Sequence, residues 1–158
     1  MPTIAGREIS DIGLGTMSLS LPGRPSAERA ESVIVNAVEN GINWIDTADS
    51  YGLGDGVEGH GERLVADVVD RHGLRSTVLV ATKGGHVWPP GRPRWEANGR
   101  PAHLRAACER SLRRLRTSSI DLYQLHSIDP AVPATDQFGA LAELADDCLL
   151  YTSDAADE

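Results

Sequence analysis

The chain has 158 residues, which suits one domain with a sizeable core but falls short of the ~250 residues of a complete α/β barrel. Hydrophobic residues make up 41% and charged residues 24%, a balance typical of folded proteins rather than disordered ones. The formal net charge is −8, and neither a secretory signal nor an apolar run of the ~18 residues of a membrane helix is visible, so we expect a cytoplasmic protein without nucleic-acid or membrane partners.

Short apolar runs alternate with helical periodicity along the chain. A turn at Gly6 predicts a small β-hairpin over residues 4–9. The runs that predict buried strands are, in chain order, 12–17, 42–48, 77–83 and 120–126. The segments that carry apolar residues at helical spacing are 26–40, 62–72, 101–115 and 135–146.

Local signals support these helix boundaries. Ser26 is a good N-cap for the first helix, and Gly41 suits the position that ends it. Gly73 ends the second helix, and Pro101 fits the first turn of the third. Apolar side chains are expected to anchor the fourth helix, namely Phe138, Leu141, Ala142 and Ala145.

Strand and helix therefore alternate four times. Apolar strands joined through helices predict an α/β fold in which helices cover a parallel sheet. A doubly wound sheet and a (β/α)8 barrel both fit this order, and periodicity alone does not separate them.

The last eleven residues break the pattern. Segment 148–158 lacks the glycine and the strand that should open a fifth unit, and it resembles translated adapter sequence at the end of a metagenomic reading frame. We interpret 1–147 as the domain and 148–158 as a non-native tail. A disordered acidic C-terminus is the alternative.

Ionisable side chains recur where the predicted strands end. The second strand ends near Asp46 with Tyr51 five residues later, the third ends at Lys83, and the fourth at His126. In a parallel α/β architecture the carboxyl ends of the strands share one face, where ligands bind. Each residue alone has an ordinary structural explanation, but all four at successive strand ends indicate a common site.

The segments around these residues resemble the aldo-keto reductase family. Those that carry the resemblance are 13–17, 43–52, 81–83 and 120–126, and the similarity runs through 1–147. The family's Asp, Tyr, Lys and His tetrad falls on Asp46, Tyr51, Lys83 and His126. Segments 83–86 and 125–130 are most similar to bacterial members near the pyridoxal reductases.

The resemblance implies the N-terminal half of a (β/α)8 TIM barrel, with about four βα units after a short hairpin. It also implies an oxidoreductase that uses NADP(H) to reduce an aldehyde or ketone to an alcohol, with Tyr51 as general acid. A free phenol has a pKa near ~10, so a tyrosine that donates a proton at neutral pH needs a cation nearby. Lys83 can supply that charge, Asp46 would hold Lys83, and His126 would orient the substrate carbonyl.

Only part of a cofactor site is implied. Thr16, Met17 and Asp46 would face the nicotinamide, whereas the family holds much of the nucleotide with loops after later strands. The long loop over 84–99 carries Trp88 and Trp95, of which Trp88 is expected to line the substrate pocket, although packing within the loop also explains both aromatics. The resemblance implies that the parent protein is the reductase. Because half a barrel leaves two sheet edges unpaired, we expect the isolated chain to be inactive or poorly folded.

Other motifs predict less. The glycine pattern over 54–59 spells G-x-G-x-x-G but lies several residues past a strand, so we interpret it as a flexible loop rather than a phosphate cradle. The arginines over 105–116 are expected to form a solvated helix face. No histidine or cysteine has metal-ligand spacing, so we expect no metal.

Two other hypotheses stay open. A non-catalytic, nucleotide-sensing protein can use the same scaffold, as in potassium-channel β subunits. A half-barrel can also dimerise to close its sheet. The sequence predicts neither the carbonyl substrate nor the oligomeric state.

Overall fold

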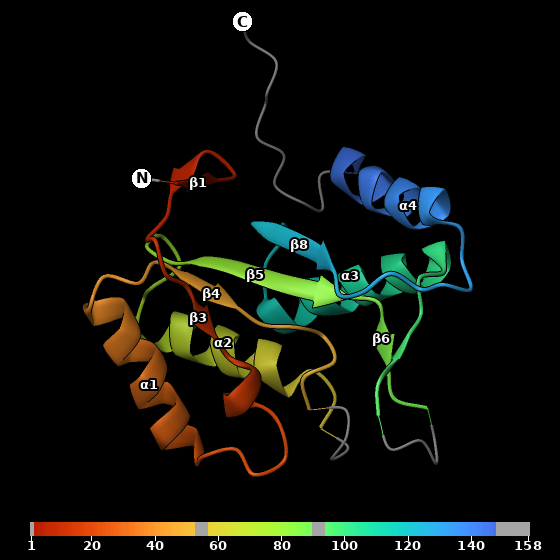
Figure 1. Cartoon of the computed structure of the whole chain (residues 1–158). Coiled ribbons are helices and arrows are strands. Elements are labelled where there is room, and N and C mark those ends of the chain that lie inside the picture. Colours follow the sequence, from red (N-terminus) through yellow and green to blue (C-terminus); the bar gives the residue numbers. More distant parts are fainter. Residues whose placement is uncertain (1, 53–56, 90–93, 148–158) are drawn as a thin grey trace, which may run out of the picture.

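Figure 1 shows a computed structural model of the chain, which describes residues 2–52, 57–89 and 94–147. Four parallel strands form its central sheet in chain order: β3 (Leu14–Gly15), β4 (Trp44–Asp46), β5 (Leu79–Gly84) and β8 (Leu122–Leu125). The helices that alternate with them are α1 (Ala27–Glu39), α2 (His60–Arg71), α3 (Pro101–Leu115) and α4 (Ala134–Asp146). The predicted order of four strand–helix units is confirmed.

Two short hairpins lie at opposite ends of the sheet (Figure 1). Strands β1 (Thr3–Ile4) and β2 (Arg7–Glu8) pair antiparallel around the predicted turn, where both Ala5 and Gly6 have positive φ. Strands β6 (His86–Val87) and β7 (Glu96–Ala97) form the second pair, beyond the carboxyl end of β5. The sequence predicted an irregular loop there, because two paired residues on each side are too few to show an alternating pattern.

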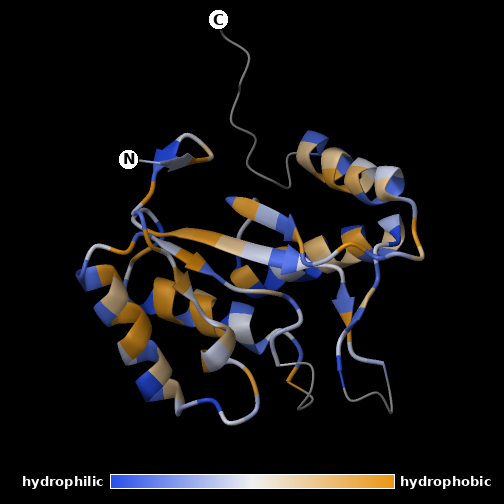
Figure 2. Cartoon of the chain, in the orientation of Figure 1, coloured by the Kyte–Doolittle hydropathy of each residue, from blue (hydrophilic) through white to orange (hydrophobic). Residues whose placement is uncertain are grey.

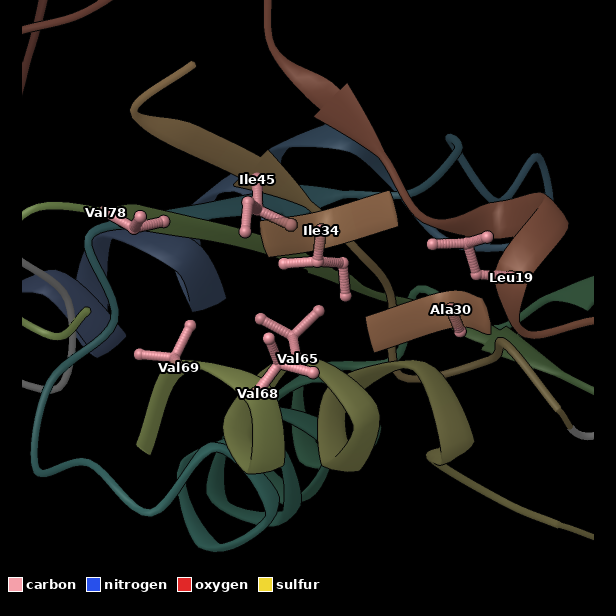
Figure 3. Close-up of a cluster of buried hydrophobic side chains, with 8 residues drawn as sticks. All are labelled: Leu19, Ala30, Ile34, Ile45, Val65, Val68, Val69 and Val78. Atoms are coloured by element: carbon pink, nitrogen blue, oxygen red, sulfur yellow. The ribbon is translucent and has the colours of Figure 1, made fainter. Parts of the chain in front are cut away.

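All four helices cover the same face of the sheet. One buried cluster joins α1 and α2 to the strands and is drawn in Figure 3; its members are Leu19, Ala30, Ile34, Ile45, Val65, Val68, Val69 and Val78. A second cluster joins α3 and α4 to β8 through Cys108, Leu115, Ile120, Tyr123 and Leu144. Val80 packs against both clusters, so the two helix pairs share one side of β5. A doubly wound sheet would place helices on both sides, and this arrangement is that of part of a barrel.

The opposite face of β5 carries the residues that alternate with Val78 and Val80. Side chains on a strand point alternately to its two faces, so Leu79, Ala81 and Lys83 share the face opposite to the four described helices. Figure 2 shows β5 changing from hydrophobic to hydrophilic toward its carboxyl end. The strand thus holds the core with its first half and presents polar groups with its last.

Most helix boundaries follow the predicted signals, but the buried face of α4 is only partly as predicted, since Leu141 packs against the core and Phe138 does not. The Ser26 hydroxyl accepts the backbone N–H of Arg29, and Gly41 follows α1 at a φ of 92°. On α4, Phe138 is 54% exposed, whereas Gln137 is fully buried. The amide of Gln137 donates to two backbone carbonyls and accepts the N–H of Asp129, which offsets the cost of burying a polar group.

None of the helices within the described ranges is both long and apolar enough to cross a membrane.

Candidate active site

The chain after β4 stays attached to β5 and thereby brings Asp46 and Lys83 together. The N–H of Thr47 donates to the carbonyl of Ala81 at 2.9 Å, and the N–H of Asp49 donates to that of Lys83 at 3.0 Å. The chain then turns, and the N–H of Tyr51 reaches the carbonyl of Ala48 at 3.4 Å. This extension of the ladder places Tyr51 at the same sheet end as Lys83.

The Lys83 ammonium is held at three points. Its Nζ donates to Asp46 Oδ2 at 2.6 Å and to the Thr47 carbonyl at 2.7 Å. It also lies 5.4 Å from the centroid of the Tyr51 ring. The second carboxylate oxygen of Asp46 accepts Nε2 of Gln124 at 3.1 Å. Gln124 pairs with Lys83 across β5 and β8, a register that the sequence does not reveal.

A glycine lets α2 approach Tyr51. Tyr51 is only 6% exposed. A Cβ added at Gly61 would lie 2.6 Å from Thr47 Oγ1 and 3.1 Å from Tyr51 Cβ, so a larger side chain there would displace the segment that carries the phenol. Close helix packing therefore fixes the position of Tyr51.

His126 follows β8 and faces the same group. Its backbone N–H donates to the Gly84 carbonyl at 2.9 Å, and its ring meets the Tyr51 ring edge-on with centroids 6.0 Å apart. The His86 ring stacks on it at 3.9 Å. The pKa of His126 is lowered to about 4, mainly by burial and to a smaller extent by the nearby His86 and Lys83. The imidazole is therefore neutral at physiological pH and can serve as a hydrogen-bond donor without carrying charge.

Aromatic rings continue outward from His126. Trp95 stacks on His86 with centroids 6.2 Å apart, and Trp88 meets the edge of Trp95 at 5.9 Å. Trp95 also lines a hollow of about 620 Å³. The predicted catalytic residues do not line it; they are Asp46, Tyr51, Lys83 and His126. Both tryptophans of the predicted loop lie in this series, and Trp95 is nearer to His126 than Trp88 is.

The residues predicted to meet a cofactor differ in access. Thr16 is fully buried, and both its N–H and its hydroxyl donate to the carbonyl of Asp46, at 2.9 and 3.0 Å. Met17 begins a short 3-10 helix, η1 (Met17–Leu19), and is 48% exposed. Thr16 thus holds the backbone at Asp46, whereas Met17 is partly open to solvent.

A buried polar network lies behind this site. Glu62 is fully buried and accepts Thr82 Oγ1 at 2.8 Å and Arg114 Nη1 at 3.1 Å. The side chain of Arg114 is only 11% exposed, so the prediction of a solvated arginine face is wrong for this residue. The error arises because helical spacing does not show that α2 and α3 pack against each other. Burial and repulsion from Glu62 raise the pKa of Asp49 to about 7.

Two other motifs need only brief comment. Within the described ranges, no group of three His, Cys, Asp or Glu side chains could hold a metal ion. Residues 54–56 of the glycine pattern lie outside the described residues, and Gly59 is the left-handed N-cap of α2.

Taken together, these features define an α/β protein with half of a (β/α)8 barrel and a cluster of polar side chains at the carboxyl ends of its strands. Residues 11–149 match the sequence model of the Aldo/keto reductase family. The chain belongs to that family, whose members are oxidoreductases.

Individual relatives agree with this assignment. The chain is 36% identical over 136 residues to a protein of Bacillus subtilis (strain 168) named uncharacterized oxidoreductase YqkF, covering 82% of this chain and 41% of that one. Its structure is similar to the holo form of aldo-keto reductase AKR11C1 from Bacillus halodurans, with a TM-score of 0.78, 30% identity and coverage of 94% and 47%. It is also similar to the glycerol dehydrogenase AKR11B4 from Gluconobacter oxydans, with a TM-score of 0.81, 30% identity and coverage of 95% and 46%. The chain therefore spans less than half the length of these relatives.

Proposed function

We propose that the protein to which this chain contributes reduces an aldehyde or ketone to an alcohol with NADPH, and that Tyr51 donates the proton. The observation that carries the proposal is the placement of the Lys83 ammonium between the Asp46 carboxylate and the Tyr51 ring. NADPH, when bound, supplies the hydride that the carbonyl carbon receives. The carbonyl oxygen takes the phenolic hydrogen of Tyr51, which balances the two-electron reduction.

The residues near β3 fit a bound nicotinamide. Gly15 pairs with Asp46 in the sheet, and apart from its two chain neighbours no atom of the described residues lies within 4 Å of the Cβ that a larger residue would place there. The exposed side chain of Met17 lies two residues further along. We propose that Met17 and Asp46 contact the ring and that Thr16 positions Asp46.

Lys83 stabilises the phenolate that forms as the proton leaves. At 5.4 Å from the ring centroid, and with an effective dielectric constant of ~20, two unit charges attract by ~3 kcal/mol. That stabilisation corresponds to a rate factor of ~10². Asp46 and the Thr47 carbonyl keep the ammonium in place, and the neutral His126 ring donates a hydrogen bond to the substrate oxygen.

The aromatic rings beside His126 bear on the substrate. We propose that Trp95 and, further out, Trp88 line the pocket for the carbonyl compound. We also propose that residues 1–147 are the N-terminal half of the domain and act in the cytoplasm. The nucleotide contacts that this half lacks then leave the isolated chain inactive.

A direct assay tests the proposed reaction. The chain, and a version extended to the length of its relatives, is mixed with NADPH and a panel of small aldehydes and ketones, and loss of NADPH absorbance is compared with alcohol formed. We expect equal amounts of both from the extended protein, and a ~10²-fold lower rate after Lys83→Met. NADPH binding without alcohol formation on any substrate would instead support a nucleotide-sensing role.

A further inference from the structure

Within the part of the chain that the structure describes, one side-chain polar atom lies within hydrogen-bond distance of Nδ1 of His126. Ser50 Oγ lies 3.4 Å from His126 Nδ1, a long separation for a hydrogen bond. Ser50 directly precedes Tyr51 and has no exposed surface. Hydrogen bonds at catalytic sites are often long before substrate binds and shorten in the complex. The contact therefore defines which group faces Nδ1 and leaves open which of the two atoms carries the hydrogen.

Counting donors and acceptors decides this question. A hydroxyl has one hydrogen to donate, and the Ser50 hydroxyl makes no second hydrogen bond within residues 2–52, 57–89 and 94–147. If Nδ1 carried the hydrogen, the hydroxyl hydrogen of Ser50 would be buried without an acceptor, which is the costlier arrangement. If Ser50 donates, its hydrogen is satisfied and Nδ1 acts as the acceptor.

The rest of the environment keeps the ring in one orientation. His86 stacks on one face of His126, at an interplanar angle of 20°, and His86 is itself held by Ser127 through a 2.7 Å contact at Nε2. The Tyr51 ring stands edge-on at 79°. A ring held in this way cannot readily flip to offer Nε2 to Ser50.

We propose that Ser50 is a positioning residue, which donates to Nδ1 of His126 and thereby fixes the imidazole tautomer that carries its hydrogen on Nε2. That hydrogen is then directed away from Ser50 and is available to an oxygen atom of a ligand. Its use on a carbonyl substrate rests on the function proposed above, whereas the tautomer itself does not.

Nitrogen NMR of the protein extended to the length of its relatives tests the tautomer directly. Long-range ¹H–¹⁵N spectra of ¹⁵N-histidine-labelled protein near neutral pH distinguish a protonated from an unprotonated ring nitrogen. For His126 we expect a protonated Nε2 and an unprotonated Nδ1, with the opposite tautomer at least ~10-fold less populated. A hydrogen found on Nδ1 would overturn the proposal without any variant being made.

Two serine variants separate positioning from general packing. Ser50→Ala removes the donor, and we expect the Nδ1 resonance of His126 to move toward that of a nitrogen without a hydrogen bond. Ser127→Ala removes the equivalent hydroxyl from His86, one ring further out, and is expected to leave His126 unchanged. Ser50→Thr keeps a donor and should restore the wild-type spectrum. Equal shifts from Ser50→Ala and Ser127→Ala, or none from Ser50→Ala, would contradict the proposal.

A result that contradicts the role of Ser50 would leave the proposed reduction intact, because NADPH consumption by the extended protein is measured independently. If the spectra show the expected tautomer but the extended protein reduces no carbonyl compound, the proposed reduction is contradicted and the role of Ser50 stands.

Discussion

Replacing Arg114 by leucine should destabilise the fold strongly, because it removes the counter-ion of a carboxylate that water cannot reach. Glu62 has no exposed surface, and among the described residues only the Thr82 hydroxyl would still hydrogen-bond to its carboxylate after Arg114→Leu. Removing one partner of a buried ion pair typically costs ~3–5 kcal/mol. With a urea dependence of ~2 kcal/mol per molar for a chain of this size, the unfolding midpoint should fall by ~1.5–2.5 M.

A neighbouring arginine provides the matched control. Arg116 pairs with Asp67 and Asp70, but its side chain is 50% exposed. Exposed pairs contribute ~0–1 kcal/mol, so Arg116→Leu should lower the midpoint by less than ~0.5 M. The assay is urea unfolding followed by far-ultraviolet circular dichroism.

The double variant Arg114→Leu, Glu62→Leu completes the test. It removes both charges and should recover much of the stability that Arg114→Leu loses, because neither member of the ion pair is then buried alone. Similar losses for Arg114→Leu and Arg116→Leu would refute this reasoning, as would a double variant no more stable than Arg114→Leu alone.

Further predictions concern the same core and the pocket. The buried Tyr123 hydroxyl has no hydrogen-bond partner among the residues that the structure describes, and a Cβ at Gly84 would lie 2.0 Å from it. Tyr123→Phe should therefore leave the unfolding midpoint unchanged or higher, and Gly84→Ala should cost ~1–3 kcal/mol in the wild type but less beside Tyr123→Phe. Equal costs in the two backgrounds would argue against this contact. The pKa of Asp49 is raised from 3.8 to about 7 in the folded protein, so the carboxyl group binds a proton more tightly in the folded state than in the unfolded state. The free energy of unfolding therefore falls as the pH rises from about 4 to 7. Asp49→Asn should raise the free energy of unfolding at about pH 8, by up to ~4 kcal/mol, and not at about pH 4; a gain independent of pH would contradict it. In the extended protein, Trp95→Ala should raise KM for a carbonyl substrate more than Trp88→Ala does, since Trp95 stacks on His86; the reverse order would count against the proposed pocket.

The elements could be predicted because their signals are local. Ser26 and Gly41 mark the two ends of α1, and apolar runs mark each strand of the sheet. The grouping of Asp46, Lys83 and His126 could also be predicted, since parallel strands direct their carboxyl ends to one face. The structure places Asp46, Lys83 and His126 at this carboxyl end of the sheet.

The remaining features depend on the registry between distant segments. Gln124 meets Asp46 only because β8 pairs with β5 in one particular register. Gln137 replaces Phe138 on the buried side of α4 because backbone groups of the preceding loop satisfy its amide. Glu62 and Arg114 are 52 residues apart, and nothing in either helix alone shows that they meet.

The most direct measurement of the central claim compares catalysis and nucleotide binding in Tyr51→Phe. Phenylalanine keeps the ring that packs against Lys83 and His126 and removes only the acidic hydrogen. In the extended protein we expect the rate of carbonyl reduction to fall by ~10²–10⁴-fold, while the Kd for NADPH, measured by fluorescence, changes little. Turnover close to that of the wild type would show that Tyr51 is not the proton donor.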